Sequence, residues 1–450
     1  MTLNTTTIFL LSACSVTAIA QGQNFKNLLN FNQYNGSDPY AGLVQGTDGN
    51  LYGTTLGGGF YGWGTVFKIS VEGELITLHS FHKIDGSQPD APLLQATDGF
   101  LYGTTRYDGA NNVSAGTIFK VSPDGAFTTL YNFDVLHGAN PQGALVQGSN
   151  GNFYGTTVGG GSHRVGTVFE MTPAGMVRTL YNFDGIEGPS GLIQATDGNF
   201  YGTTNGLGAG TFGTVFQITP QGTFTSLHSF QSTDGAYPLG GVIQASDGNF
   251  YGTTSKGGDL GYGTVFKMTA DGTLTTVHSF VASDGPNPTG AVIEATDGNF
   301  YGLTNNESLS PSYTGTIFKI TPGGTLTVLH NFPTYTYPYS ALVQSTNGDF
   351  YGISYLGGTR DSGTIYGLAT GLGTFVTTVP TSGSAGRNVR ILGTGLTGAT
   401  GVTFNGTAAV FAVAADSEIT TSVPAGATTG TVQVLTPGGT FLSNITFLVP

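Results

Sequence analysis

The sequence predicts an all-β fold: a seven-bladed β-propeller with four antiparallel strands per blade, followed by an immunoglobulin-like β-sandwich. Three observations support this: a glycine-rich and charge-poor composition, a repeat of about 50 residues, and a change of pattern near residue 374. Of the 450 residues, 74 are glycine, 12% are aromatic and 9% are charged. Glycine is unfavourable inside helices, and disordered chains carry more charge and fewer aromatic residues.

Residues 1–20 are predicted to form a secretory signal peptide. An apolar stretch starts at Ile8 and closes with the small-x-small pattern AIA at Ala20, and it is too short to span a membrane. The alternative is a lipoprotein-like box, LSAC, in which Cys14 would be lipidated and would tether the protein. Cys14 is the only cysteine, so cleavage after Ala20 leaves no thiol.

Three short motifs recur in the same order along the chain. The first, [LF]-Y-G-x, has its tyrosine at Tyr52, Tyr102, Tyr154, Tyr201, Tyr251, Tyr301 and Tyr351. The second, G-T-[VI]-[FY], starts at Gly64, Gly116, Gly166, Gly213, Gly263, Gly315 and Gly363. The third, [LV]-x-[SN]-F, ends at Phe81, Phe133, Phe183, Phe230, Phe280 and Phe332. Seven units therefore fill the region from about residue 41 to 368.

Each unit is predicted to contain four strands, and the fifth unit shows why. Its expected strands are 241–245, 250–254, 263–268 and 273–280. Asp-Gly pairs at Asp247 and Asp271 favour tight hairpin turns between these strands. Strict alternation in the last strand would place four side chains on one side: Leu274, Thr276, His278 and Phe280.

The ends of the repeat region predict a closed arrangement. The seventh unit stops near residue 370 without its third motif, while an extra copy, LLNF, ends at Phe31 before the first unit. An N-terminal strand is therefore expected to complete the seventh blade, which removes a free sheet edge. We assign residues 21–370 to the propeller. A solenoid has a similar period but would need atypical end units.

The repeated polar residues are explained by packing and turns. Four histidines occupy one repeat position, where other units have tyrosine: His79, His228, His278 and His330. Equivalent positions on different blades are spread around a ring, so no shared metal is expected. The acidic residues Asp48, Asp98, Asp197, Asp247 and Asp297 all lie in tight turns, where aspartate is favoured without calcium. No metal site or cofactor is predicted.

Candidate binding residues lie in the longer loops between the second and third strands. These loops vary while the strands repeat, as expected where a rigid scaffold presents a binding surface. The candidates are Phe60, Tyr61, Trp63, His163, Arg164, Tyr355 and Arg360. Exposed aromatic rings suit a carbohydrate, because sugar faces stack on them. The alternative is that these rings pack on their own neighbouring loops.

Charge and motifs exclude several functions. The net charge of −13 would repel a phosphate backbone, so nucleic acid is not expected as a partner. No stretch approaches the ~20 apolar residues of a membrane span. HExxH, GxSxG, P-loop and cysteine-nucleophile motifs do not occur, and no catalytic residue is nominated.

The repeat stops at about residue 374, and 374–450 are assigned to a separate small domain. Its expected strands are 388–392, 401–405, 408–413, 418–423, 430–435 and 441–449. Turns every eight to twelve residues are typical of an immunoglobulin-like sandwich. A three-residue linker, 371–373, is too short to separate the domains widely.

Residues 24–370, with the blocks DGNFYGTT, GTVF and LHSF, resemble the tandem GloVer repeats of choice-of-anchor bacterial surface proteins. The tail, with PTSG at Pro380, GTGL at Gly393, VTFNG at Val402, VPAG at Val423 and TPGG at Thr436, resembles an IPT/TIG domain. The resemblance implies an exported protein and carries over no catalytic residue. The chain ends in FLVP without an apolar span or basic tail, so surface retention would need Cys14 or the sandwich.

The sequence thus predicts an extracellular or cell-surface, non-enzymatic binding or adhesion protein whose partner is a glycan or a surface protein. Two alternatives stay open: a polysaccharide-processing enzyme (a lyase or glycosidase) and a structural component of the cell surface. Activity assays would identify the first, and self-association without a ligand would identify the second.

Overall fold

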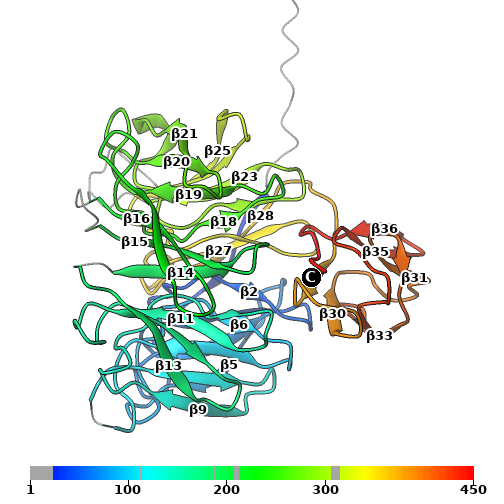
Figure 1. Ribbon diagram of the computed structural model, residues 1–450, viewed down its shortest axis with the longest axis horizontal. Coiled ribbons are helices and arrows are strands. Elements are labelled where there is room, and N and C mark those ends of the chain that lie inside the picture. The colour runs from blue at the N-terminus through cyan, green and yellow to red at the C-terminus, as the bar shows by residue number, and fades with distance from the viewer. Residues whose placement is uncertain (1–23, 112, 186–187, 207–211, 306–314, 450) are drawn as a thin grey trace, which may run out of the picture.

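The computed structural model describes residues 24–111, 113–185, 188–206, 212–305 and 315–449. The predicted signal peptide and Cys14 lie outside these residues. The described chain is all-β, and one short 3-10 helix, η1 (Ala282–Asp284), lies in a connection between two sheets. Among the described residues, no helix has the length and hydropathy needed to cross a membrane. Figure 1 shows the repeat sheets grouped together, with the C-terminal domain beside them.

Four-stranded antiparallel sheets follow one another along the repeat region. The first contains β2 (Val44–Gln45), β3 (Leu51–Thr55), β4 (Thr65–Ile69) and β5 (Leu75–Ser80). The second contains β6 (Leu94–Gln95), β7 (Leu101–Thr105), β8 (Thr117–Val121) and β9 (Phe127–Asn132). The third contains β10 (Val146–Gln147), β11 (Phe153–Thr157), β12 (Thr167–Met171) and β13 (Val177–Asn182).

The pattern continues to residue 369. The fourth sheet contains β14 (Pro189–Gln194), β15 (Phe200–Thr204), β16 (Thr214–Ile218) and β17 (Phe224–Ser229). The fifth contains β18 (Ile243–Gln244), β19 (Phe250–Thr254), β20 (Thr264–Met268) and β21 (Leu274–Ser279). The sixth contains β22 (Ile293–Glu294), β23 (Phe300–Thr304), β24 (Thr316–Ile320) and β25 (Leu326–Asn331). The seventh contains β26 (Val343–Gln344), β27 (Phe350–Ser354), β28 (Thr364–Ala369) and β1 (Asn24–Asn30).

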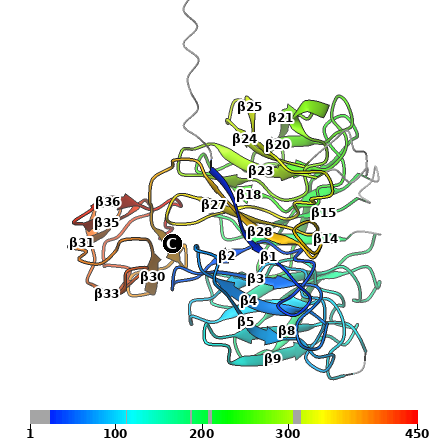
Figure 2. The ribbon, with the colours of Figure 1, turned by 180° about the vertical axis from the view of Figure 1, so that it is seen from behind.

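The strand β1 comes from the far end of the chain and forms the outer edge of the seventh sheet. It pairs antiparallel with β28, from Asn24 opposite Ala369 to Asn30 opposite Thr364. Figure 2 shows β1 lying along β28. Phe31, just after β1, is 1% exposed and donates its N–H to the carbonyl of Gly363. The strand β1 belongs to the seventh sheet, and the chain then continues directly into the first sheet, so β1 joins the two sheets.

The first two sequence motifs belong to one packing unit. Gly53 of the YG motif lies opposite Phe67 of the GTVF motif on neighbouring strands. A Cβ on Gly53 would come within 2.6 Å of the Phe67 ring. The glycine therefore leaves the space that the phenylalanine ring fills, which explains why the two motifs recur together.

The outermost strand corrects the prediction of strict alternation. In the fifth sheet Phe266 is opposite Thr276 but Val265 is opposite His278, so one extra residue interrupts the register. Such a β-bulge moves the following side chains to the other face. Leu274 and Thr276 therefore share the face of Phe266, whereas His278 and Phe280 lie on the face of Val265.

Hydrophobic clusters lie between neighbouring sheets rather than in one central core. Each of seven clusters combines residues of two adjacent sheets. One joins the first and seventh sheets, with Phe67 and Leu43 packed against Tyr351 and Ile365. The junction between the two ends of the repeat region thus has the same kind of core as the junctions within it.

A set of side-chain hydrogen bonds also connects the sheets in a cyclic order. In each pair of neighbouring sheets, a Gln or Glu ends the short first strand of one sheet. Its side-chain oxygen accepts a hydrogen bond from a backbone N–H in a turn of the preceding sheet. The described bonds, donor to acceptor, are Thr47 to Gln95, Thr97 to Gln147, Ser149 to Gln194, Thr196 to Gln244, Ser246 to Glu294, Thr296 to Gln344 and Thr346 to Gln45. Their N···O distances run from 2.7 Å (Ser246 to Glu294) to 3.2 Å (Thr296 to Gln344). The bond from Thr346 to Gln45 links the last sheet to the first.

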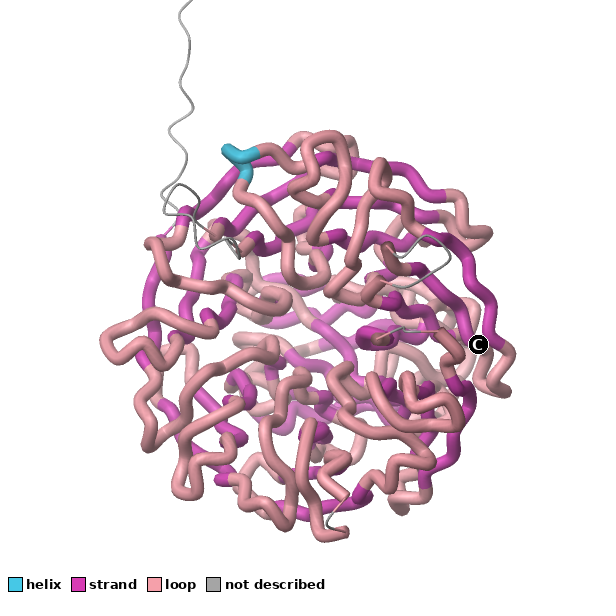
Figure 3. Tube along the Cα trace, turned by 90° about the vertical axis from the view of Figure 1, so that its left-hand side faces the viewer, coloured by secondary structure: helices cyan, strands magenta, loops and turns pink. Residues whose placement is uncertain are grey.

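The short first strands meet at the centre of the array, where the backbones approach closely. A Cβ on Gly240 would lie 2.2 Å from the backbone nitrogen of Ala291 in the next sheet. We call the side with the tight hairpins, such as residues 46–50, the turn face. The opposite side, with loops such as residues 56–64, is the loop face and is turned toward the viewer in Figure 3.

The C-terminal domain consists of two sheets. One contains β29 (Thr377–Val379), β30 (Asn388–Leu392), β34 (Glu418–Ser422) and β33 (Phe411–Ala415). The other contains β32 (Thr407–Ala408), β31 (Gly401–Phe404), β35 (Val432–Thr436) and β36 (Gly439–Leu442). Ile391 and Ile419 of the first sheet share one buried cluster with Phe404 and Val434 of the second. The expected strand 408–413 is instead split between β32 and β33, and β29 was not expected.

The C-terminal domain contacts the turn face of the repeat region. The Ser417 hydroxyl donates to the carbonyl of Thr47 in the first sheet, at 2.8 Å. The hydroxyl of Thr394, in the C-terminal domain, hydrogen bonds to the hydroxyl of Thr346 in the seventh sheet, also at 2.8 Å. Arg387 donates to the carbonyl of Ser149 in the third sheet. The turn face is therefore partly covered, and the loop face carries no such domain in the described chain.

Candidate functional site

The loop between β3 and β4 forms an exposed aromatic surface on the loop face. Phe60 is 84% exposed and Tyr61 51%, and their ring centroids are 4.8 Å apart. Tyr61 also contacts the ring of His82 edge-on at 4.9 Å. Trp63 packs partly into the core, with the Lys83 ammonium 4.4 Å above its ring. We call these five residues the loop patch.

The other predicted binding residues are not brought together with the loop patch. His163 and Arg164 are exposed in the loop after β11, on the third sheet. Arg360 is exposed in the loop after β27, on the seventh. Tyr355 is only half-exposed, because its ring packs edge-on against Tyr40 at 5.9 Å. The seven candidates therefore belong to three separate loops.

Tyr40 belongs to a polar group that the sequence analysis did not single out. The group consists of Tyr40, Asp90, Arg106, Gln142 and Tyr339, and we call it the loop-face centre. The rings of Tyr40 and Tyr339 lie 4.1 Å apart and join the first and seventh sheets. Gln142 of the third sheet donates its amide N–H to Asp90 Oδ2 of the second, at 3.2 Å. Burial is the main cause that raises the pKa of the Tyr40 hydroxyl, and the charges of Asp90 and Arg106 also act on it, so side chains from four sheets contribute to one site.

Asp90 is the most unusual residue of the loop-face centre. Its side chain is 4% exposed, and the nearest cation, Arg106 Nη1, is 3.7 Å from Oδ2. Burial raises the pKa of Asp90 to about 7, although Arg106 and Gln142 act in the opposite direction. Within the described chain, Asp90 Oδ1 and Arg106 Nε are buried without a hydrogen-bond partner. Such atoms are energetically unfavourable unless something binds them.

The sequence did contain a signal for this group. Each connection between sheets has a proline, and the residue after it varies in chemistry while its neighbours stay similar. These residues are Tyr40, Asp90, Gln142, Ser190, Leu239, Thr289 and Tyr339. Arg106 and Tyr355 occupy a second variable position, directly after the second strand of a unit. Variation at fixed positions of a repeat is expected where the side chains serve binding rather than packing of the strands.

The sixth sheet repeats this arrangement with uncharged groups. Thr289 and Asn305 occupy the positions of Asp90 and Arg106 and are 3% and 2% exposed. In the part of the chain that the structure describes, Thr289 Oγ1 and Asn305 Oδ1 also lack a partner. Unsatisfied polar atoms thus recur at the same two positions of the loop face.

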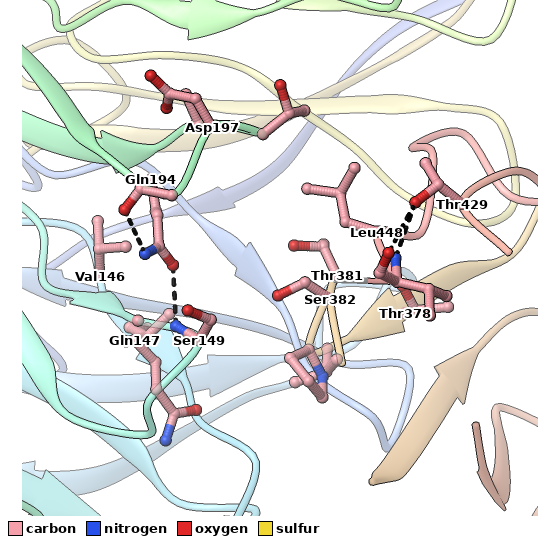
Figure 4. A pocket seen from close by; sticks show the side chains of 18 of the residues that line it. Val146, Gln147, Ser149, Gln194, Asp197, Thr378, Thr381, Ser382, Thr429 and Leu448 are labelled. Carbon is pink, nitrogen blue, oxygen red and sulfur yellow. Dashed lines mark hydrogen bonds between the residues drawn. The ribbon is translucent and has the colours of Figure 1, made fainter. Parts of the chain in front are cut away.

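A cavity of about 480 Å³ lies at the turn face, between the repeat sheets and the C-terminal domain. Figure 4 shows Gln194, Asp197 and Ser149 on one side and Thr378, Ser382 and Thr429 on the other. Most of its polar groups are already used: Gln194 binds Ser149 N at 2.8 Å and the Gly198 carbonyl at 2.9 Å. Thr378 Oγ1, by contrast, is buried and has no partner in the described chain.

Two of the repeated histidines, His79 and His330, bridge neighbouring outer strands. The ring of His79 stacks on Phe127 of the next sheet at 3.7 Å, and its Nε2 lies 3.0 Å from Asp85. His330 stacks in the same way on Phe25 of β1, also at 3.7 Å. Within the described ranges, no group of three His, Cys, Asp or Glu side chains is close enough to hold a metal ion.

The chain belongs to the family of the Gloeobacter/Verrucomicrobia repeat, whose family model matches residues 7–190 and 188–414. These matches cover most of the chain and extend beyond β28 into the C-terminal domain. No curated protein is significantly similar in sequence.

Solved structures show the same kind of fold at low sequence identity. A streptogramin B lyase aligns with a TM-score of 0.56 and 15% identity, covering 78% of this chain and 98% of the lyase. Virginiamycin B lyase from Staphylococcus aureus, crystallised with quinupristin, aligns with a TM-score of 0.56 at 15% identity, covering 77% and 99%. A fungal alcohol oxidase of the AA5 family, in complex with copper, reaches 0.53 at 13% identity and covers 96% of this chain and 99% of the oxidase. These similarities establish a β-propeller-like scaffold and no specific activity.

Proposed function

We propose that the repeat sheets close into a seven-bladed ring and that the C-terminal domain is an immunoglobulin-like domain of the IPT/TIG type. Three kinds of contact support closure between the last and first sheets. They are the β1–β28 pairing, the hydrophobic cluster around Phe67 and Tyr351, and the hydrogen bond from Thr346 to Gln45. The first completes the seventh sheet with a strand from the other end of the chain, and the other two repeat, between the last and first sheets, what joins neighbouring sheets elsewhere.

We propose that this protein is an exported, non-enzymatic binding or adhesion protein of the choice-of-anchor surface class, which presents its loop face to an extracellular glycan. The observation that carries this proposal is the exposure of Phe60 and Tyr61, on a face that the C-terminal domain leaves uncovered. Aromatic rings held on a rigid scaffold provide apolar contact area at a low cost in conformational entropy.

A binding experiment tests the proposed function. The mature chain, from residue 21 onward, is applied to a polysaccharide array, and the double variant Phe60→Ala, Tyr61→Ala is compared with it. We expect at least a tenfold loss of binding, because the rings that would contact the glycan are removed. The control is Met176→Ala, which removes an exposed apolar side chain (68% exposed) from a turn-face hairpin. Equal binding by the double variant and the parent chain would contradict the proposal.

A polysaccharide-processing enzyme is the second candidate, and Asp90 is the observation that favours it. A buried carboxyl with a pKa of about 7 beside an arginine suits general acid or base catalysis near neutral pH. Turnover of any member of a polysaccharide panel, lost in Asp90→Asn, would replace the binding proposal with this one.

A further inference from the structure

We propose that the loop-face centre is a second ligand site, which binds one neutral sugar residue through two adjacent hydroxyl groups held between Asp90 and Arg106. The inference rests on the proposed function only for the ligand class, because the residues involved are different from those of the loop patch.

The two key atoms offer one acceptor and one donor. Asp90 Oδ1 accepts hydrogen bonds, Arg106 Nε–H donates one, and neither is used within the described chain. Asp90 Oδ2 and Arg106 Nη1 are 3.7 Å apart, which is beyond direct hydrogen-bond distance. A group that both donates and accepts would satisfy the acid and the arginine at once. Neighbouring hydroxyls of a sugar have this property, since one can donate to Oδ1 while the next accepts from Nε.

The charge of the site selects a neutral ligand. Above pH 7, where Asp90 is ionised, its charge and that of Arg106 balance each other, and an anionic ligand would meet the acceptor atoms of Asp90. A cationic ligand would be repelled by Arg106, which has no second carboxylate partner among the described residues. Gln142 adds an uncharged amide that already contacts Asp90 Oδ2 at 3.2 Å.

The surroundings provide access and an apolar surface. Both atoms are covered by their own neighbours, so the ligand must displace a side chain before it reaches them. Arg106 is the part that can move, because its side chain is 38% exposed. Its guanidinium lies over the ring of Tyr107, 5.0 Å from the ring centroid. The rings of Tyr40 and Tyr339, tilted by 31° to each other, belong to the same centre and offer an apolar contact for a sugar ring.

Calorimetric titration of the mature chain with small glycosides tests this inference. The probes are methyl α-D-mannopyranoside, methyl β-D-glucopyranoside and methyl β-D-galactopyranoside, with methyl β-D-glucuronide as the charged counterpart. We expect the parent chain to bind at least one neutral glycoside and to bind the glucuronide at least tenfold more weakly. Asp90→Asn and Arg106→Lys should each weaken binding of the neutral glycoside at least tenfold. Arg106→Lys keeps the positive charge but removes the Nε–H donor.

Matched variants separate this site from other effects. Arg178→Lys changes an arginine that pairs with Glu170 away from the loop face, and it should leave glycoside affinity within twofold. Phe60→Ala, Tyr61→Ala should also leave it within twofold, although it reduces polysaccharide binding. Urea unfolding confirms that each variant is folded. The inference is overturned if no neutral glycoside binds the parent chain, or if folded Asp90→Asn and Arg106→Lys bind as well as the parent. Neither result would contradict the polysaccharide binding assigned to the loop patch.

Discussion

The turn face and the loop face are built from the same repeats, yet their polar side chains have different roles. On the turn face, Gln and Glu side chains bind the backbone of the preceding sheet, in a cycle that includes the bond from Thr346 to Gln45. On the loop face, Asp90 and Arg106 keep buried atoms without partners among the described residues. One face uses its polar groups for assembly, and the other holds them where a ligand can use them.

The difference follows from how strongly each position is constrained. A turn-face glutamine has a fixed target, because the N–H of the neighbouring turn is present in every unit. A residue after the connection proline has no fixed partner, so Tyr40, Asp90 and Ser190 can differ without disturbing the strands. A repeat protein can therefore vary its binding groups at little cost to its architecture.

Removing β1 should have the largest effect on stability. Deletion of residues 24–31 exposes the edge of β28 and removes Phe31, which is 1% exposed. The loss should exceed the roughly 3–5 kcal/mol that truncating one buried phenylalanine costs. Urea unfolding of the deleted and parent chains measures it, with Phe60→Ala as a control that should change stability by less than about 0.5 kcal/mol. An unchanged unfolding midpoint in the deleted chain would argue against ring closure.

The hydrogen-bond cycle of the turn face predicts a graded effect. Gln95→Leu leaves the N–H of Thr47 without its acceptor, and both residues are 6% exposed. The expected loss is about 1–3 kcal/mol, the cost of an unsatisfied buried donor. Gln244→Leu should cost less, because Gln244 is half-exposed and water can replace it. Equal losses of unfolding free energy in the two variants, measured by urea unfolding, would show that burial does not determine how much each of these hydrogen bonds stabilises the fold.

The pKa of Asp90 predicts a smaller effect that depends on pH. Burial raises the pKa of Asp90 from its ordinary value near 4 to about 7, so between these values the folded chain holds a proton that the unfolded chain has released. Its contribution to stability is therefore present below pH 4 and is lost as the pH rises to 7. Compared with Asp90→Asn, the parent chain should lose stability as the pH rises through this window, with a slope of at most about 1.4 kcal/mol per pH unit.

Asp247 provides the control of opposite sign. Burial alone would raise its pKa, but hydrogen bonds from Lys267 and Asn249 lower it to about 2. Its stabilisation is present above pH 4 and is lost as the pH falls toward 2. Urea unfolding of Asp90→Asn, Asp247→Asn and the parent chain from pH 3 to pH 8 measures the two effects. If Asp90→Asn and the parent chain differ by the same amount at every pH, the Asp90 carboxyl is not perturbed.

The sequence predicted the repeat units well because each motif is tied to local packing. The strand 250–254 was placed correctly, since Asp-Gly turns and aromatic residues define it within one unit. The bulge opposite Val265 and Phe266 was missed, because an extra residue in the last strand leaves no mark on its alternating composition. Of the loop patch, the sequence analysis named Phe60, Tyr61 and Trp63 as binding candidates but not His82 or Lys83, and a role in binding stays a prediction. The structure gives exposures of 84% for Phe60 and 51% for Tyr61.

The loop-face centre was missed for a physical reason. Asp90 and Arg106 are 16 positions apart, and Gln142 belongs to another unit. Their proximity depends on how neighbouring sheets meet at the centre, and no motif spacing encodes that distance. Comparing equivalent positions across the seven units would have found the variable residues, although not the burial that gives Asp90 its raised pKa.

A crystal structure of residues 21–450 soaked with methyl α-D-mannopyranoside, methyl β-D-glucopyranoside or methyl β-D-galactopyranoside tests the contrast between the two faces most directly. We expect the sugar at the loop-face centre, with neighbouring hydroxyls within hydrogen-bond distance of Asp90 Oδ1 and Arg106 Nε. A sugar seated only in the turn-face cavity beside Gln194 and Thr378 would contradict the account.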